Sequence, residues 1–278
     1  MTLTSFRSFI TMFIIIVGIT ISAEAITRIM PLGDSITYDD TYADAEHPRP
    51  AGKRSGYRNY LWYKLRDVNF TADFVGSQIA GQDIRPPFDP DNEGHPGWTS
   101  YDIAEYTYGY MSNSKPDVVL LHIGTNDHAT TSPDGVNRIL DEINIYEENS
   151  GKHVQVYVAL IIDRKEHDGR IKIFNERLKE LLLKRISQGD DIVIVDMYHD
   201  IGLTSSDYAD NTHPNDHGYY KMAGVWFNAI MNNININTNL RAFPTSLVPQ
   251  ESIVQVSYDD EKNSVTFLVD IPDSGIQF

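Results

Sequence analysis

A serine near the start of the chain and an aspartate–histidine pair far downstream could together perform nucleophilic catalysis. Ser35 ends a Gly-Asp-Ser tripeptide, and Asp210 and His213 stand three residues apart in the run Asp-Asn-Thr-His-Pro. A serine hydroxyl is a weak nucleophile until an imidazole removes its proton, and that imidazole needs a carboxylate to hold its tautomer. The order and spacing predict Ser35 as nucleophile, His213 as general base and Asp210 as the residue that orients the base.

Two further residues could stabilise an oxyanion in the transition state. Gly76 has no side chain, so a carbonyl oxygen can approach its N–H closely, and Asn126 offers a neutral amide donor. Together with the backbone N–H of Ser35, they predict an oxyanion hole. The structural alternatives are a turn glycine at residue 76 and a helix cap at residue 126 or at residue 35.

Other polar residues near these positions are expected to serve the structure. Asp34 and Asp127 could shape their loops through hydrogen bonds. His213 and His217 are four apart, as in some metal pairs, but Pro214 intervenes and no acidic third ligand stands at helical spacing. No phosphate-binding loop or dinucleotide fingerprint occurs either. The sequence therefore predicts no metal and no cofactor.

Aromatic side chains near the predicted site could bind sugar rings, whose faces pack well on aromatics. We expect Trp98 to contact substrate, and Tyr38, Tyr42 and Tyr101 lie in neighbouring segments of the chain. The alternative is that Trp98 packs beneath the predicted site and does not contact substrate, and the same alternative applies to each tyrosine.

Strand-like and helix-like segments alternate from residue 26 to residue 232. Strands are predicted at residues 26–32, 70–75, 117–123, 154–162 and 192–195, and helices at residues 57–67, 132–148, 170–186 and 217–232. Such alternation predicts a three-layer α/β/α domain around a central five-stranded parallel sheet. Ligands bind at the carboxyl ends of such strands, where each of the four candidate blocks would lie.

The two ends of the chain differ from this domain. Residues 1–25 read as a signal peptide, with Arg7 before an apolar run and a small-x-small site at residues 23–25; an uncleaved anchor is the alternative. The main α/β domain is expected over residues 26–240. Residues 241–278 contain two strand-like runs, 252–258 and 264–269, and form either a C-terminal β-hairpin tail or the start of a truncated β-module.

Composition narrows the classes of partner and the compartment. The chain carries a formal net charge of -16, which disfavours nucleic acid and anionic lipid as partners. It has no cysteines, so packing and not disulfides must stabilise it. With the leader, these features predict a secreted or periplasmic protein with no stable membrane partner, and they leave the oligomeric state open.

Around these residues the chain resembles the SGNH (GDSL-type) hydrolases, in which four blocks carry Ser, Gly, Asn and His. More narrowly, it is similar to carbohydrate esterase family 3, typified by acetylxylan esterases. The segments that carry the likeness are residues 30–37, 56–58, 74–77, 93–99 and 122–127. The resemblance implies a flavodoxin-like sheet, a serine mechanism without metal and acetylated polysaccharide, acetylxylan above all, as substrate.

The chain departs from that family beside the nucleophile. Tyr38-Asp39-Asp40 stands where the relatives carry a glycine, and a longer polar insert, Thr41 to Ser55, follows. We expect this insert to bear on the substrate and to leave the reaction class intact. The alternatives are a lipid esterase or thioesterase of the same superfamily, and a non-catalytic carbohydrate-binding surface protein.

Overall fold

The computed structural model describes residues 26–242, 253–259 and 264–270, with side chains as far as residue 234. The predicted signal peptide, residues 1–25, lies outside the described residues. The strands of the main sheet are β1 (Thr27–Gly33), β2 (Ala72–Phe74), β3 (Gln78–Ile79), β4 (Asp91–Gly94), β5 (Val118–His122), β6 (Gln155–Ala159) and β7 (Ile192–Val195). The α-helices are α1 (Ser35–Tyr38), α2 (Arg58–Asp67), α3 (Ser100–Ser114), α4 (Asp134–Ser150), α5 (Gly169–Ser187), α6 (Met197–Asp200) and α7 (Asp216–Ala242), and the short 3-10 helices are η1 (Tyr42–Asp44), η2 (Ala51–Lys53) and η3 (Ser205–Asp207).

The central sheet contains the five predicted strands, all parallel, in the order β2-β1-β5-β6-β7. Two short strands extend it beyond the prediction. β4 pairs with the carboxyl end of β1 in parallel, and β3 pairs with β4 in the antiparallel direction. The predicted three-layer α/β/α fold with a central parallel sheet is thus confirmed, and the antiparallel β3 makes the whole sheet mostly parallel. The additional strands adjoin the carboxyl end of β1, which leads into the loop of Ser35.

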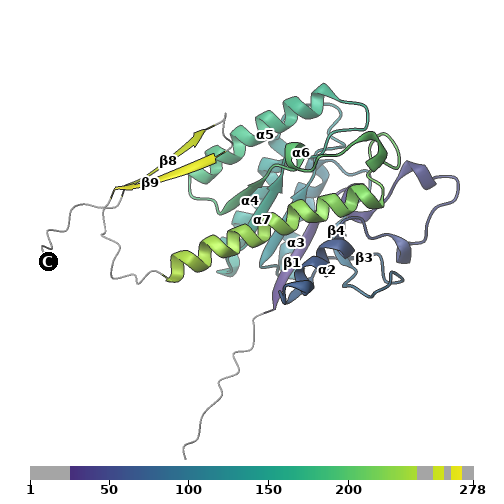
Figure 1. Ribbon diagram of the computed structural model, residues 1–278, viewed down its shortest axis with the longest axis horizontal. Helices are drawn as coiled ribbons and strands as arrows, with labels where there is room; N and C mark the ends of the chain where they lie inside the picture. The colour runs from purple at the N-terminus through teal and green to yellow at the C-terminus, as the bar shows by residue number, and fades with distance from the viewer. Residues whose placement is uncertain (1–25, 243–252, 260–263, 271–278) are drawn as a thin grey trace, which may run out of the picture.

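Helices cover both faces of the sheet, as Figure 1 shows. Successive strand residues face opposite layers: Val119 and Leu121 pack with α3, α4 and α5, whereas Leu120 packs with α2 and α7. Each layer forms one buried apolar cluster. The sheet is therefore buried on both sides, which explains why its central strands read as continuous apolar runs.

The helix α3 was not predicted. Its buried residues are Ser100, Ile103, Ala104, Thr107 and Met111. Their spacing is helical, but three of the five are small or polar, so the apolar periodicity is weak. A capping box between Thr99 and Asp102 marks the start of the helix and was the available signal.

Beyond the main domain, β8 (Ile253–Asp259) and β9 (Ser264–Asp270) pair as antiparallel strands, close to the two predicted runs. Whether this pair is a simple tail or part of a larger module stays a prediction. No helix in the described part of the chain combines the length and the apolar character that a membrane crossing needs.

Candidate active site

The first site residue lies where β1 turns into α1. Asp34 caps this short helix, since its Oδ1 accepts a hydrogen bond of 2.9 Å from the backbone N–H of Ile36. Gly33 is required there, because a side chain at that position would collide with the backbone carbonyl oxygen of His122. Ser35 therefore begins α1 at the carboxyl edge of the sheet, and only 7% of its surface is exposed.

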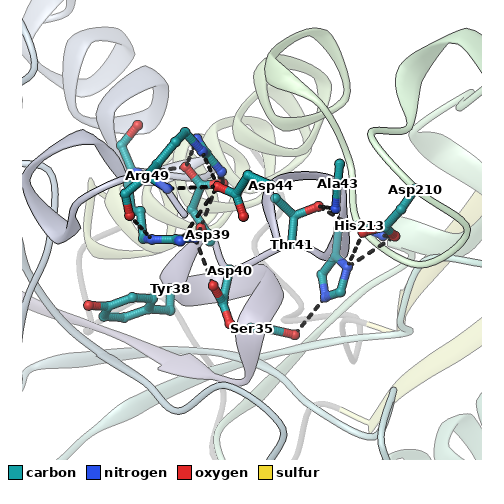
Figure 2. A network of polar contacts seen from close by, with 12 residues as sticks. Ser35, Tyr38, Asp39, Asp40, Thr41, Ala43, Asp44, Arg49, Asp210 and His213 are labelled. Carbon is teal, nitrogen blue, oxygen red and sulfur yellow. Dashed lines mark hydrogen bonds and ion pairs between the residues drawn. The ribbon is translucent and has the colours of Figure 1, made fainter. Parts of the chain in front are cut away.

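The structure brings the three predicted acid–base residues together, although 178 positions separate the serine from the histidine (Figure 2). Ser35 Oγ lies 2.9 Å from His213 Nε2. His213 Nδ1 lies 2.9 Å from Asp210 Oδ2 and 3.1 Å from Oδ1. A carboxylate beside Nδ1 keeps the proton on that nitrogen, so Nε2 can accept the serine proton. This is the geometry that an activated serine requires.

The Asp210 carboxylate is held in its ionised form. Burial opposes its ionisation, but hydrogen bonds from the Thr41 hydroxyl and from two backbone N–H groups of its own loop outweigh burial and hold the pKa of Asp210 below its ordinary value. The two loop donors are the N–H groups of Thr212 and His213, at 2.7 and 2.8 Å from Oδ1. A carboxylate that stays charged can stabilise an imidazolium throughout the working pH range.

The predicted oxyanion donors have free hydrogen-bonding capacity. Within the described residues, the backbone N–H groups of Ser35 and Gly76 donate to no protein acceptor. Asn126 donates one of its two amide protons to the backbone oxygen of Trp98, at 2.9 Å, which leaves the other available. β1, β2 and β5 are adjacent parallel strands, so the three donors lie at one edge of the sheet. Such an edge can receive a negatively charged oxygen.

The loop that carries Gly76 is fixed by a buried carboxylate. Glu93 Oε2 accepts from the Ser77 N–H at 2.7 Å, and its Oε1 accepts from the Ser77 hydroxyl at 2.6 Å. A side chain at residue 76 would collide with the backbone oxygen of Asn92, so the glycine is also a packing requirement. The sequence analysis missed this role of Glu93; its place in the block at residues 93–99 was the available signal.

A second unpredicted residue connects two of the candidate blocks. Arg164 lies in the loop between β6 and α5, and its guanidinium donates to Thr212 Oγ1 at 2.6 Å and to the backbone oxygen of Thr125 at 3.2 Å. The first contact fixes the loop of His213, and the second fixes the loop of Asn126. No local pattern in the sequence marks Arg164, because both contacts cross 39 or more positions.

The aspartates expected to shape loops do so. Asp127 accepts hydrogen bonds from the backbone N–H and the hydroxyl of Ser100, at 2.8 and 2.5 Å. Asp34 is fully buried, and burial, with some repulsion from Asp127, raises its pKa to about 7 despite hydrogen bonds that favour the charged form. Within the described residues, neither of these carboxyl groups forms a hydrogen bond with the hydroxyl of Ser35.

His217 does not join His213 in a cluster. Its Nδ1 pairs with Asp207 at 2.5 Å, and Asp207 also binds Lys221 at 2.9 Å. Over the described residues, no group of three or more potential ligands could hold a metal ion.

The candidate aromatic residues lie at different places on the rim. Trp98 is half-buried, stacks on His95 with ring centroids 4.4 Å apart and packs against the apolar cluster that contains Ile103. Tyr42 forms a T-shaped contact with the His213 ring, with ring centroids 5.1 Å apart, and is 72% exposed. Tyr42 is thus the aromatic residue that directly adjoins the acid–base pair.

Comparisons with known proteins show the family of the chain. Residues 32–221 match the GDSL-like Lipase/Acylhydrolase family, a span that includes every candidate site residue. The chain is 30% identical over 241 residues to a multidomain esterase of Ruminococcus flavefaciens, which covers 75% of this chain and 29% of that protein. The chain thus spans less than a third of this curated relative.

Two solved structures are similar over nearly their whole length. A family 3 carbohydrate esterase of Clostridium thermocellum shares 27% identity, with a TM-score of 0.64, over 77% of this chain and 99% of the other. An acetyl esterase variant solved with an acetate ion shares 27% identity, with a TM-score of 0.61, over 76% of this chain and 100% of the other.

Proposed function

This chain belongs to the GDSL-like lipase/acylhydrolase family, its domain is a carboxylic ester hydrolase, and we propose that it removes acetyl groups from polysaccharide, with acetylxylan as the main candidate. The observation that carries the chemistry is the continuous hydrogen-bonded series from Ser35 Oγ through His213 to Asp210. The support for the substrate is the likeness to a family 3 carbohydrate esterase and to an acetyl esterase with acetate.

Acylation begins when His213 Nε2 accepts the hydroxyl proton of Ser35 and Oγ attacks the ester carbonyl carbon. The carbonyl oxygen becomes negatively charged, and the N–H groups of Ser35, Gly76 and Asn126 stabilise it. The imidazolium, held against Asp210, then gives its proton to the departing sugar oxygen. Acetyl-Ser35 remains, and the deacetylated sugar leaves.

Deacylation repeats these steps with water as the nucleophile. His213 removes a proton from water, the hydroxide attacks the acetyl carbonyl, and the same donors stabilise the second oxyanion. The proton returns to Ser35 Oγ as acetate is released. The cycle as proposed uses side chains and backbone N–H groups of this chain, together with water.

Two aromatic side chains support a sugar as the leaving group. Tyr42 is exposed beside His213. The backbone oxygen of Trp98 accepts a hydrogen bond from the proposed oxyanion donor Asn126, which brings the Trp98 residue to the same edge of the sheet. A pyranose ring linked to the scissile oxygen can pack against either face. We propose both as substrate contacts, with Ser35, Asp210 and His213 as the catalytic residues.

A secreted or periplasmic location is part of the same proposal, since acetylated plant polysaccharide is too large to enter a cell. The basis is the leader-like sequence at residues 1–25, in which Arg7 precedes an apolar run. The mass of the protein recovered from the medium or periplasm of its host would show whether that leader has been removed.

The central test compares Ser35→Ala with the parent protein on acetylated xylan, other acetylated glycans and aryl esters of increasing chain length. Ser35→Ala should lose activity by several orders of magnitude and keep its melting temperature. Retention of more than a few per cent of activity would exclude Ser35 as the nucleophile. Aryl acetate should be cleaved faster than the octanoate; since each buried methylene contributes about 0.8 kcal/mol in an accepting pocket, the opposite trend would indicate a lipid esterase.

A further inference from the structure

Residues 39–54, which contain most of the polar insert that follows α1, extend along the edge of the sheet to Asp210. We call these residues the arm. Thr41 Oγ donates to Asp210 Oδ2 at 2.7 Å, and the backbone N–H of Tyr42 donates to the same oxygen at 2.8 Å. Figure 2 shows Thr41 near His213 and Asp210, with the imidazole of His213 between Ser35 and Asp210.

The two oxygens of Asp210 are held by different parts of the protein. Oδ1 accepts from the N–H groups of Thr212 and His213, which belong to its own loop. Oδ2, the oxygen nearer to His213 Nδ1, has the arm donors as its other partners. The arm and the loop of His213 therefore fix the rotation of the carboxylate about its terminal bond together, and the arm supplies the donors at the oxygen that faces the imidazole more closely.

The arm is built to hold that position. Arg49 binds both carboxylate oxygens of Asp39, at 2.9 and 3.1 Å, and binds Asp44 at 2.8 Å. Arg54 is buried and binds Asp40 at 2.7 Å (Figure 2). Two guanidinium groups thus clamp the three carboxylates that flank Thr41.

Polar contacts, and not apolar packing, attach the arm to the rest of the rim. A cavity of about 470 Å³ lies between the arm and the start of α7, lined by Ala43 and Arg49 on one side and by Asn215 and His217 on the other. None of the arm's large side chains belongs to either apolar cluster. The hydrogen bonds to Asp210 and the ring contact of Tyr42 with His213 connect the arm to the loop of His213.

We propose that Thr41 is a positioning residue for catalysis, which acts through Asp210 to keep the His213 imidazole aligned with Ser35. The proposal rests on the catalytic roles assigned under the proposed function, and it is independent of the glycan. Thr41 also accepts a hydrogen bond from the N–H of Ala43 at 3.2 Å, as the N-cap of η1. A purely structural role for Thr41 would consist of that cap alone.

The test compares Thr41→Val, which keeps the shape and removes the hydroxyl, with Thr41→Ser, which keeps the hydroxyl. On aryl acetate, Thr41→Val should lower kcat at least about tenfold and change KM by less than about twofold, because it removes a hydrogen bond to a charged group. Thr41→Ser should keep at least half of kcat. Equal losses in both variants, or a kcat within twofold of the parent in Thr41→Val, would overturn the proposal.

A matched control separates positioning from capping. Thr204 is the N-cap of η3, and its hydroxyl donates to the Asp207 carboxylate at 2.9 Å, as Thr41 does to Asp210, but outside the triad. Thr204→Val should lower the melting temperature and leave kcat within about twofold of the parent. If Thr204→Val lowers kcat as much as Thr41→Val does, loss of a cap explains both, and the proposal fails.

A double-mutant cycle tests the route through Asp210. Adding Thr41→Val to Asp210→Asn should cost less than threefold in kcat, since the carboxylate that Thr41 positions is already gone. Independent, multiplicative losses would refute the proposal. Should Thr41→Val be insoluble, Thr41→Ala carries the same comparison. Activity of Ser35→Ala is read separately, so failure of the serine mechanism and failure of the positioning role are distinguishable.

Discussion

The buried carboxyl beside the nucleophile should make the protein less stable as the pH rises through neutrality. Asp34 has no exposed surface, and burial raises its pKa from 3.8 to about 7. One of its oxygens, Oδ2, has no hydrogen-bond partner in the structure, so the ionised form is poorly compensated. The perturbation that tests this is Asp34→Asn, which keeps the shape and the acceptor for the Ile36 N–H and cannot ionise.

The direction and the magnitude of this change in stability with pH follow from proton linkage. Between pH 3.8 and about 7 the unfolded chain has released this proton and the folded protein keeps it, so the unfolded state binds fewer protons and stability falls with rising pH. At 1.36 kcal/mol per pKa unit, the cost of Asp34 is about 2 kcal/mol at pH 5 and about 4 kcal/mol at pH 8. The stability difference between Asp34→Asn and the parent should therefore widen by roughly 2–3 kcal/mol across this range.

Urea unfolding of both proteins at pH 5, 6, 7 and 8 measures that difference directly. Groups that titrate in both proteins cancel, including His122, whose burial lowers its pKa to about 4. If the difference in unfolding free energy between the two proteins stays constant with pH, or narrows as the pH rises, Asp34 is not a buried carboxyl that stays protonated in the folded protein. Aryl acetate hydrolysis by Asp34→Asn should persist, because this carboxyl makes no hydrogen bond to Ser35 Oγ or His213.

Three further substitutions test the supports of the site. Gly76→Ala should lower kcat/KM on aryl acetate at least tenfold, because its methyl group would collide with the backbone oxygen of Asn92; an active, equally stable variant would contradict this. Glu93→Gln should cost roughly 10- to 100-fold in kcat/KM, since it replaces one of the two oxygens that accept from Ser77 with an amide nitrogen, which is a donor; unchanged kinetics would exclude a role in holding Gly76. Trp98→Ala should lower the melting temperature and impair hydrolysis of acetylated xylan more than that of aryl acetate, and equal losses on both would remove Trp98 from the substrate contacts.

The layers of the fold were predictable because a parallel sheet buried on both faces leaves long apolar runs. The run around Leu120 and the amphipathic pattern of α5 identify their elements without reference to the rest of the chain. β4 escaped prediction because it contains Asp91, Asn92 and Glu93, which read as a loop. Its pairing with β1 is a long-range contact, which local patterns do not record.

The catalytic candidates were predictable for a different reason. Serine chemistry demands particular residue types in one mutual arrangement, so Ser35, Asp210 and His213 could be recognised from type, order and spacing. The residues that support them could not. Glu93 and Arg164 act through contacts with loops that fold against them, and a carboxylate or guanidinium in those positions has no distinctive local pattern.

The arm combines a position close to Ser35 in the sequence with a long-range contact to Asp210. It follows α1 directly, so Ser35 and Thr41 are six positions apart, whereas Thr41 and Asp210 are 169 positions apart and in contact. Ser35 and Asp210 are thus connected twice, once through the imidazole of His213 and once through the short backbone from α1 to Thr41. Since the second connection does not involve the reacting atoms, it can persist while the proton moves between Ser35 and His213. The sequence predicts that this insert affects the choice of substrate. Its contacts with Asp210 indicate that it also helps to hold Asp210 and His213 in position.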